Sequence, residues 1–193
     1  MEAENIHPSV KVAAPEAPRL VCILGAESTG KSTLTRALAT HFDCPWVDEY
    51  LREFCDQNRR TPEAHEQAAI LHTQRQLEIS AQQQGLQQAK RYVFCDTSPL
   101  LTAIYSEFVF GDTGLYALAR RLQLNYALTL LLAPDIPWVA DGLQRDGEQV
   151  RGPITERIIR ELADLKVPHA PIAGHGPQRL RAAINAITSI DSI

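Results

Sequence analysis

The sequence predicts an α/β fold in which a parallel sheet of about five strands is flanked by helices. Short apolar segments alternate along the chain with longer segments of helical character. This alternation is typical of parallel strands joined by helical crossovers. The segment 126–132 is almost wholly apolar, as strands inside a parallel sheet are. A glycine-rich loop separates the first apolar segment from the first helix, and such loops bind phosphate groups.

The composition predicts one domain. The chain has 193 residues, of which 45% are hydrophobic, and this is enough apolar material for one core. Residues 1–18 are polar and without periodicity, so we expect a flexible tail followed by one domain over residues 19–193. The tail lacks the pattern of a secretion signal and no apolar run could span a bilayer, which predicts a cytoplasmic protein. The net charge of −4 argues against a nucleic-acid partner.

The individual elements follow from local signals. Thr61 and Pro62 form the polar cap and proline start of a long helix that runs to about Lys90. Glycines in 111–114 break the helical region that follows the third strand. The expected strands are 20–24, 45–47, 91–95, 126–132 and 167–172. Helices are expected to open at Ser32 and to cover 51–58, 61–90, 99–122 with that break, 153–165 and 178–190.

The glycine-rich loop carries the motif G-x-x-x-x-G-K-S. It follows a strand and opens a helix, which is where a P-loop binds the phosphates of a nucleoside triphosphate. Backbone N–H groups and the helix dipole then converge on the phosphates. Lys31 is expected to reach the terminal phosphates, and the Ser32 hydroxyl to hold Mg²⁺. The residues assigned to the nucleotide are Gly25, Ala26, Glu27, Ser28, Thr29, Gly30, Lys31, Ser32 and Thr33.

Two further strand ends are expected beside this loop. Ligands of parallel sheets lie beyond the carboxyl ends of the strands, and the segments 48–50 and 96–98 follow two of the expected strands. Asp96 stands where a Walker-B acid orients Mg²⁺. The same residue can cap the following helix, and the two roles are compatible. Ser32 and Asp96 are therefore the candidate metal residues.

An acidic pair closes the second expected strand. Asp48 and Glu49 are both candidates for the base that accepts a proton from an acceptor hydroxyl. Neighbouring residues at a strand end point to opposite sides, so one of them is expected to face the site. The alternative is a solvated acidic turn. Arg52 follows closely, and it could pair with either acid or contact the substrate.

The connector 141–151 is polar, contains glycine and bears arginines. It suits a lid whose arginines, Arg145 and Arg151, neutralise a transferring phosphoryl group. The alternative is an ordinary surface loop. Tyr50 and Trp138 flank the same crevice and could stack on a flat ring, although core packing is the commoner role of a lone aromatic residue.

Together these motifs resemble the ribosylnicotinamide kinase domain of the bacterial NadR family. The matching segments are I-L-G-A-E-S-T-G-K-S (23–32), E-Y-L-R-E-F (49–54), F-C-D-T (94–97) and P-W-V-A-D-G-L (137–143). The glutamate inside the P-loop and the E-Y-x-R-E and W-V-x-D-G runs are more specific than the P-loop alone. The similarity extends from about Arg19 to the C-terminus.

The resemblance implies a nucleoside-kinase-like P-loop fold and ATP- and Mg²⁺-dependent phosphorylation of the 5′-hydroxyl of nicotinamide riboside, which yields nicotinamide mononucleotide. It assigns the acceptor hydroxyl to Glu49 rather than Asp48, and the magnesium to Ser32 and Asp96. The positions that it places near the nucleoside are Tyr50, Arg52, Trp138 and Asp141.

Two departures from the family pattern leave alternatives open. The family domain is usually fused to an adenylyltransferase, whereas a short tail precedes Arg19 here, which predicts a stand-alone kinase. The family tends to place arginine directly after D-G-L, where this chain has Gln144, so the choice of lid arginine stays open. The alternative functions are a kinase for another nucleoside or a small alcohol, and a P-loop ATPase or switch. Homo-oligomerisation is possible.

Overall fold

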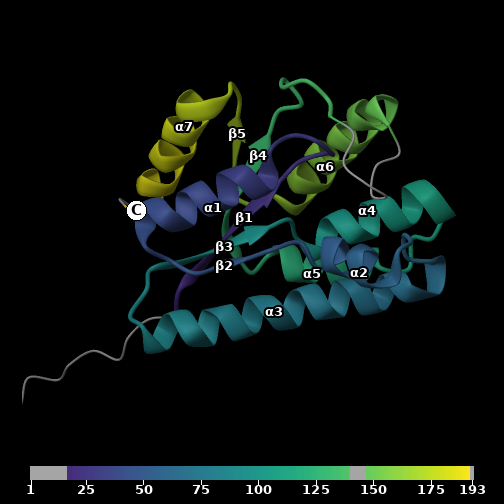
Figure 1. Cartoon of the computed structure of the whole chain (residues 1–193), viewed down its shortest axis with the longest axis horizontal. Coiled ribbons are helices and arrows are strands. Elements are labelled where there is room, and N and C mark those ends of the chain that lie inside the picture. The colour runs from purple at the N-terminus through teal and green to yellow at the C-terminus, as the bar shows by residue number, and fades with distance from the viewer. Residues whose placement is uncertain (1–16, 140–146, 192–193) are drawn as a thin grey trace, which may run out of the picture.

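The computed structural model describes residues 17–139 and 147–191. Its core is a five-stranded sheet in the order β2-β3-β1-β4-β5, with every neighbouring pair parallel, so the predicted α/β class is confirmed. Figure 1 shows the strands side by side, with helices above and below them. The strands are β1 (Arg19–Leu24), β2 (Trp46–Val47), β3 (Tyr92–Asp96), β4 (Tyr126–Leu132) and β5 (His169–Ile172).

Helices cover both faces of the sheet because successive side chains of each strand alternate between two apolar clusters. In β1, Val21 and Ile23 pack with α1 (Lys31–Phe42) and α7 (Gly176–Ser189). Leu20, Cys22 and Leu24 pack on the opposite face. That face is covered by α3 (Gln67–Gln87), α4 (Pro99–Phe110), α5 (Tyr116–Gln123) and α6 (Arg151–Leu165).

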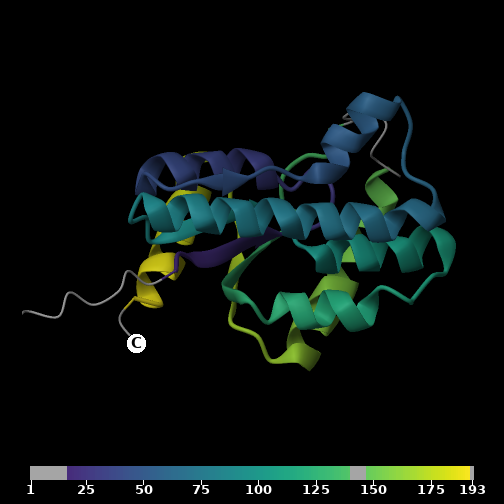
Figure 2. The ribbon, with the colours of Figure 1, turned by 90° about the horizontal axis from the view of Figure 1, so that it is seen from below.

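A shorter helix, α2 (Tyr50–Asn58), follows β2 and stands out from the layers, as the view turned by 90° shows (Figure 2). Two single-turn 3₁₀ helices complete the described part, η1 (Ala64–Glu66) and η3 (Glu148–Val150). Because β2 has only two residues, the sheet itself holds little of the segment that leads into α2.

The start of the long helix differs from the sequence prediction. Helix α3 begins at Gln67 and not at Thr61, because Glu63 and Glu66 form a capping box around η1 instead. Arg60 donates to both carboxylate oxygens of Glu66, at 2.6 and 2.8 Å. This bond and the backbone N–H of Glu63 lower the pKa of Glu66 to about 2. Thr61 and Pro62, just before η1, line a cavity that is described below.

The predicted break after the third strand is present. Helix α4 ends at Phe110 and is capped by Gly111, whose φ of 70° is the left-handed conformation that glycine adopts readily at a helix end. The chain resumes as α5 at Tyr116. Within the described ranges, no helix is both long and apolar enough to cross a membrane.

Candidate active site

The P-loop is held in shape mainly by its own residues. Gly30 has a φ of 79° and Ser28 a φ of 54°, so the chain turns sharply before α1. A Cβ at Gly25 would lie 2.9 Å from Thr29 Oγ1 and 3.1 Å from Leu132, which explains the glycine there. The Thr29 hydroxyl donates to the carbonyl of Ala26 at 2.8 Å. The loop therefore closes on itself and directs its N–H groups to one side.

A residue that the sequence did not single out supports the loop from behind. Arg179 of α7 is buried, and its guanidinium donates to the carbonyls of Thr29 and Gly174 and to the carboxylate of Asp135. Burial lowers the pKa of Arg179. Three loops at the carboxyl edge of the sheet thus share one side chain. No local sequence pattern predicts this contact, because Thr29 and Arg179 are 150 positions apart.

Lys31 lies in the centre of the site. Its Nζ donates to the carbonyl of Ala26 at 3.2 Å, and the side chain is buried. A cavity lined by residues 28–33 and Arg52 lies over the loop, where the P-loop motif predicts the donor phosphates. The same lysine also lines a second cavity, which we call the larger cavity because 17 residues line it, against seven for the first. Lys31 therefore stands at the junction of the two spaces.

Asp96 and Ser32 fit a magnesium site. Asp96 is fully buried, and within residues 17–139 and 147–191 neither of its carboxylate oxygens has a hydrogen-bond partner. Burial and the negative charge of Glu49 raise the pKa of Asp96 to about 6, and Lys31 and the Ser32 hydroxyl oppose that shift. Magnesium uses few protein ligands besides water and phosphate oxygens, so one hydroxyl and one buried carboxylate suffice.

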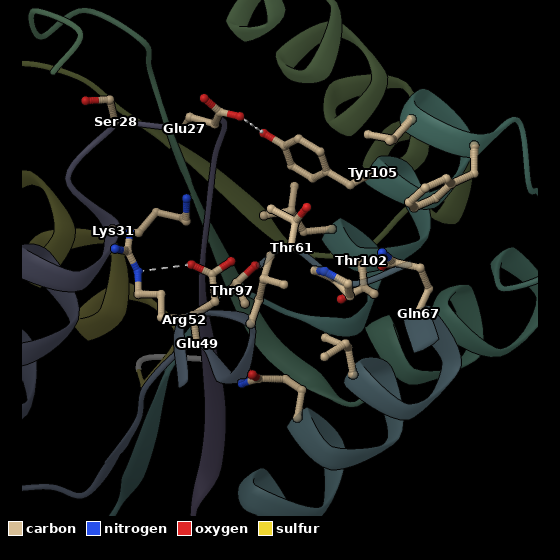
Figure 3. A pocket seen from close by; sticks show the side chains of 17 residues that line it. Glu27, Ser28, Lys31, Glu49, Arg52, Thr61, Gln67, Thr97, Thr102 and Tyr105 are labelled. Carbon is tan, nitrogen blue, oxygen red and sulfur yellow. Dashed lines mark hydrogen bonds and ion pairs between the residues drawn. The ribbon is translucent and has the colours of Figure 1, made fainter. Parts of the chain in front are cut away.

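The larger cavity extends from Lys31 between the P-loop and helices α2, α3 and α4 (Figure 3). Lys31, Glu49 and Arg52 lie together at one end of it, and Thr102 and Gln67 lie farther from Lys31 (Figure 3). Apolar side chains also contribute to the lining. The residues that line it are Glu27, Ser28, Lys31, Glu49, Leu51, Arg52, Thr61, Pro62, Gln67, Ile70, Gln74, Thr97, Leu101, Thr102, Tyr105, Val109 and Phe110.

The acidic pair is divided by the strand end, as expected. Glu49 lines the cavity, its side chain is 11% exposed, and it pairs with Arg52 Nε at 3.3 Å. Figure 3 shows this pair beside Lys31. The Asp48 side chain is 53% exposed and pairs with Arg36 at 3.1 Å, and it does not line the cavity. We therefore do not carry Asp48 forward as a base.

The opposite side of the cavity brings the P-loop glutamate to α4. The Tyr105 hydroxyl donates to Glu27 Oε1 at 3.3 Å, and Figure 3 shows the two side chains pointing toward each other. Glu27, which the sequence assigned to the nucleotide, therefore also faces the larger cavity. The neighbouring Ser28 accepts a hydrogen bond from the N–H of Val139 at 3.0 Å.

Thr97 is a further cavity residue that the sequence left without a role. Its φ is 76°, a strained conformation for a β-branched residue. The side chain is 4% exposed and lines the cavity. Across the described part of the chain its hydroxyl has no hydrogen-bond partner. A buried hydroxyl without a partner is costly, and such groups gather where a ligand binds.

Three other predicted residues do not line the larger cavity. Tyr50 is held through its backbone N–H, which donates to Gln74 at 2.8 Å. Trp138 is half-buried next to Val139, the residue bonded to Ser28. Arg151 is buried, and both of its terminal nitrogens donate to the carbonyl of Ile136 at 3.1 Å. Arg151 therefore braces the segment after β4. Asp141 and Arg145 lie outside the described residues.

Comparison with known proteins agrees with this geometry. The profile of the AAA domain family matches residues 20–179. The trifunctional NAD biosynthesis/regulator protein NadR of Salmonella typhimurium is 28% identical over 150 residues, which are 75% of this chain and 35% of that protein. NadR of Escherichia coli is 28% identical over 152 residues, 76% of this chain and 36% of the relative. The chain thus spans about a third of the length of these relatives.

Solved structures show the same fold. A crystal structure of NadR in complex with NR superposes with a TM-score of 0.75 at 24% identity, over 91% of this chain and 52% of that one. Thymidylate kinase from Ehrlichia chaffeensis gives 0.61 at 14% identity, over 91% and 100% of the two chains. Deoxyadenosine kinase from M. mycoides gives 0.62 at 12% identity, over 88% and 99%. The predicted kinase-like P-loop fold and the resemblance to NadR are confirmed, and the predicted enzyme class, a phosphotransferase, agrees with these neighbours.

Proposed function

The chain belongs to the AAA domain family, and from that premise we propose that it is a kinase that phosphorylates the 5′-hydroxyl of nicotinamide riboside with Mg²⁺ and ATP. The observation that carries the proposal is the larger cavity, which begins at Lys31 and Glu49 and extends away from the P-loop. A phosphate site alone fits any P-loop protein. A second cavity that shares its lysine fits an acceptor molecule.

On the donor side, the P-loop N–H groups and Lys31 bind the triphosphate. Ser32 and Asp96 would hold a magnesium ion, which would offset the charge of the phosphate groups. The support for ATP is that a NadR structure was solved with NAD and AMP-PNP, with a TM-score of 0.75 at 23% identity. Arg179 keeps the loop in place from behind, which fixes the direction of the N–H groups.

On the acceptor side, Glu49 accepts the proton of the attacking hydroxyl. The hydroxyl oxygen forms a bond to the terminal phosphorus while the bond from that phosphorus to the bridging oxygen breaks. ADP leaves with the bond electrons, and the proton passes from Glu49 to solvent. Arg52, paired with Glu49 at 3.3 Å, holds the carboxylate toward Lys31. The products are nicotinamide mononucleotide and ADP.

The choice of acceptor rests on the relatives and on the lining of the cavity. NadR was solved with NR, and the cavity combines an apolar wall with the amide of Gln67 and the hydroxyls of Thr61 and Thr102. Such a lining suits a flat ring with a polar substituent. Another nucleoside is the second candidate, because the fold is shared with thymidylate kinase and deoxyadenosine kinase.

A panel assay tests the proposal. The purified protein is incubated with Mg²⁺ and ATP and one of several ribonucleosides, and the products are identified by mass spectrometry. Nicotinamide riboside is expected to give its monophosphate and one equivalent of ADP, and the variant Lys31→Met is expected to give neither. Faster turnover of a different nucleoside would transfer the proposal to that acceptor. ATP hydrolysis that is indifferent to every nucleoside would favour a P-loop ATPase instead.

A further inference from the structure

One buried side chain of α3 forms hydrogen bonds to the backbone on both sides of Glu49, the proposed base. Gln74 is 2% exposed. Its Oε1 accepts from the backbone N–H of Tyr50 at 2.8 Å, and its Nε2 donates to the backbone carbonyl of Asp48 at 3.4 Å. The two backbone groups belong to the peptide bonds on either side of Glu49. Glutamine is suited to this contact because it offers a donor and an acceptor on one planar group.

The two hydrogen bonds of Gln74 hold a part of the backbone that neither strand β2 nor helix α2 holds by itself. Strand β2 pairs with β3 only through Trp46 and Val47, so the sheet ends before Asp48. Glu49 is the N-cap of α2, and its side chain makes no cap hydrogen bond. The first N–H of a helix needs a partner from elsewhere, and Gln74 provides it. With both peptide planes held, the Cα–Cβ bond of Glu49 has one direction, into the cavity.

The glutamine is carried by a firmly anchored helix. One turn further along α3, the buried carboxylate of Glu78 accepts from the Tyr126 hydroxyl of β4 at 2.5 Å and from Arg75 at 3.0 Å. Positions 74 and 78 lie on the same face of the helix. The inner strand β4 therefore fixes the register of α3, and with it the position of Gln74.

We propose that Gln74 is a positioning residue that holds Glu49 in the orientation for proton transfer. This inference rests on the proposed role of Glu49. Small displacements of a catalytic group reduce turnover by up to about a hundredfold. The glutamine fixes the backbone of Glu49 and not the donor nucleotide, so its loss acts on turnover and leaves the binding of ATP unchanged.

The test compares two glutamines of the same helix. Gln74→Met keeps the length of the side chain but removes both hydrogen bonds. Gln82→Met is the matched control, because Gln82 also makes a hydrogen bond to backbone, to the carbonyl of Pro18 at 2.9 Å, far from the cavity. For Gln74→Met we expect kcat to fall at least about tenfold, with the KM for ATP within about twofold. Gln82→Met is expected to keep the kcat of the parent protein.

Hydrogen exchange of the Tyr50 amide supplies a second readout that needs no activity. Its exchange in Gln74→Met is expected to speed up at least about tenfold, because the amide loses its acceptor. Gln74→Asn serves if the methionine variant folds poorly, since its shorter amide cannot span both backbone groups. The same effects on kcat and exchange are expected.

Two results would overturn the inference. One is an unchanged kcat in a folded Gln74→Met protein whose Tyr50 amide exchanges faster. The other is a rise confined to the KM of the acceptor with the amide still protected, which would mean that Gln74 contacts the acceptor directly. A failure of the proposed function is distinguishable, because the parent protein itself would then turn over no nucleoside.

Discussion

The two halves of the site are built in different ways. The donor half is one continuous loop, residues 25–33, whose hydroxyl and lysine groups bond to its own backbone at Ala26. The acceptor half is assembled from the P-loop, the start of α2, the middle of α3 and the start of α4. Its residues are held by side chains from other elements. The donor half therefore depends mainly on local geometry, to which Arg179 adds one distant contact, and the acceptor half depends on the packing of helices around a short strand.

The largest expected effect concerns the acceptor half. Glu49→Gln removes the proposed proton acceptor while it keeps the shape of the side chain. We expect kcat to fall by about 10²–10⁴, with ATP affinity unchanged because the P-loop is intact. Steady-state kinetics and a nucleotide-binding titration measure the two quantities. Asp48→Asn is the control, since Asp48 faces Arg36. Equal losses in the two variants would contradict the division of the acidic pair.

An intermediate effect concerns the boundary between the halves. The pKa of Asp96 is raised to about 6 by burial and by Glu49, so the folded state binds its proton more tightly than the unfolded state does. The contribution of the Asp96 carboxyl to the free energy of unfolding is thus complete below its pKa in the unfolded state, and it is lost as the pH rises through about 6. Asp96→Asn removes this loss and is expected to raise the free energy of unfolding at pH 7 by about 1–3 kcal/mol.

Urea unfolding of the ligand-free protein at pH 4.5 and pH 7 measures that difference. The gain in Asp96→Asn over the parent protein is expected to be small at the lower pH and larger at the higher one. Magnesium-dependent turnover of the variant is expected to be lost at both. A gain that is independent of pH would mean that the cost at this position does not come from ionisation of the Asp96 carboxyl, which would contradict the raised pKa.

The smallest expected effect compares one hydroxyl from each half. Thr29→Val removes a hydroxyl that is bonded to Ala26 and is expected to destabilise the protein by about 1 kcal/mol. Thr97→Val removes a buried hydroxyl without a hydrogen-bond partner in the described structure and is expected to stabilise it by a similar amount. Urea unfolding measures both. Opposite signs support the contrast between the halves, and a destabilised Thr97→Val would contradict it.

Much of the fold could be predicted from the periodicity of apolar residues and from the turn-forming residues between the apolar segments. All five predicted strands are present in a parallel sheet. Strands of such a sheet are buried on both faces, so a short apolar segment between turn residues is typical of them. The predicted start of the long helix at Thr61 is wrong, because Thr61 and Pro62 resemble a helix start whereas the helix begins at Gln67. The capping box of Glu63 and Glu66 instead begins a separate turn. The Arg60–Glu66 interaction supports this separate turn, and helix propensities of single residues do not include such a contact.

The site was predictable where its residues are consecutive. A P-loop needs glycines, a lysine and a hydroxyl at fixed spacing, so the sequence by itself determined the phosphate loop and its place between β1 and α1. The family resemblance favoured Glu49 over Asp48, and the tertiary structure supplies the physical reason: which acid faces the cavity depends on where β2 ends and on what holds α2. The tertiary structure alone revealed the contacts of Gln74 and Arg179, because they join residues 24 and 150 positions apart that no local pattern links. Short-range geometry is encoded locally, whereas the direction of a side chain at a strand end is set by the elements packed around it.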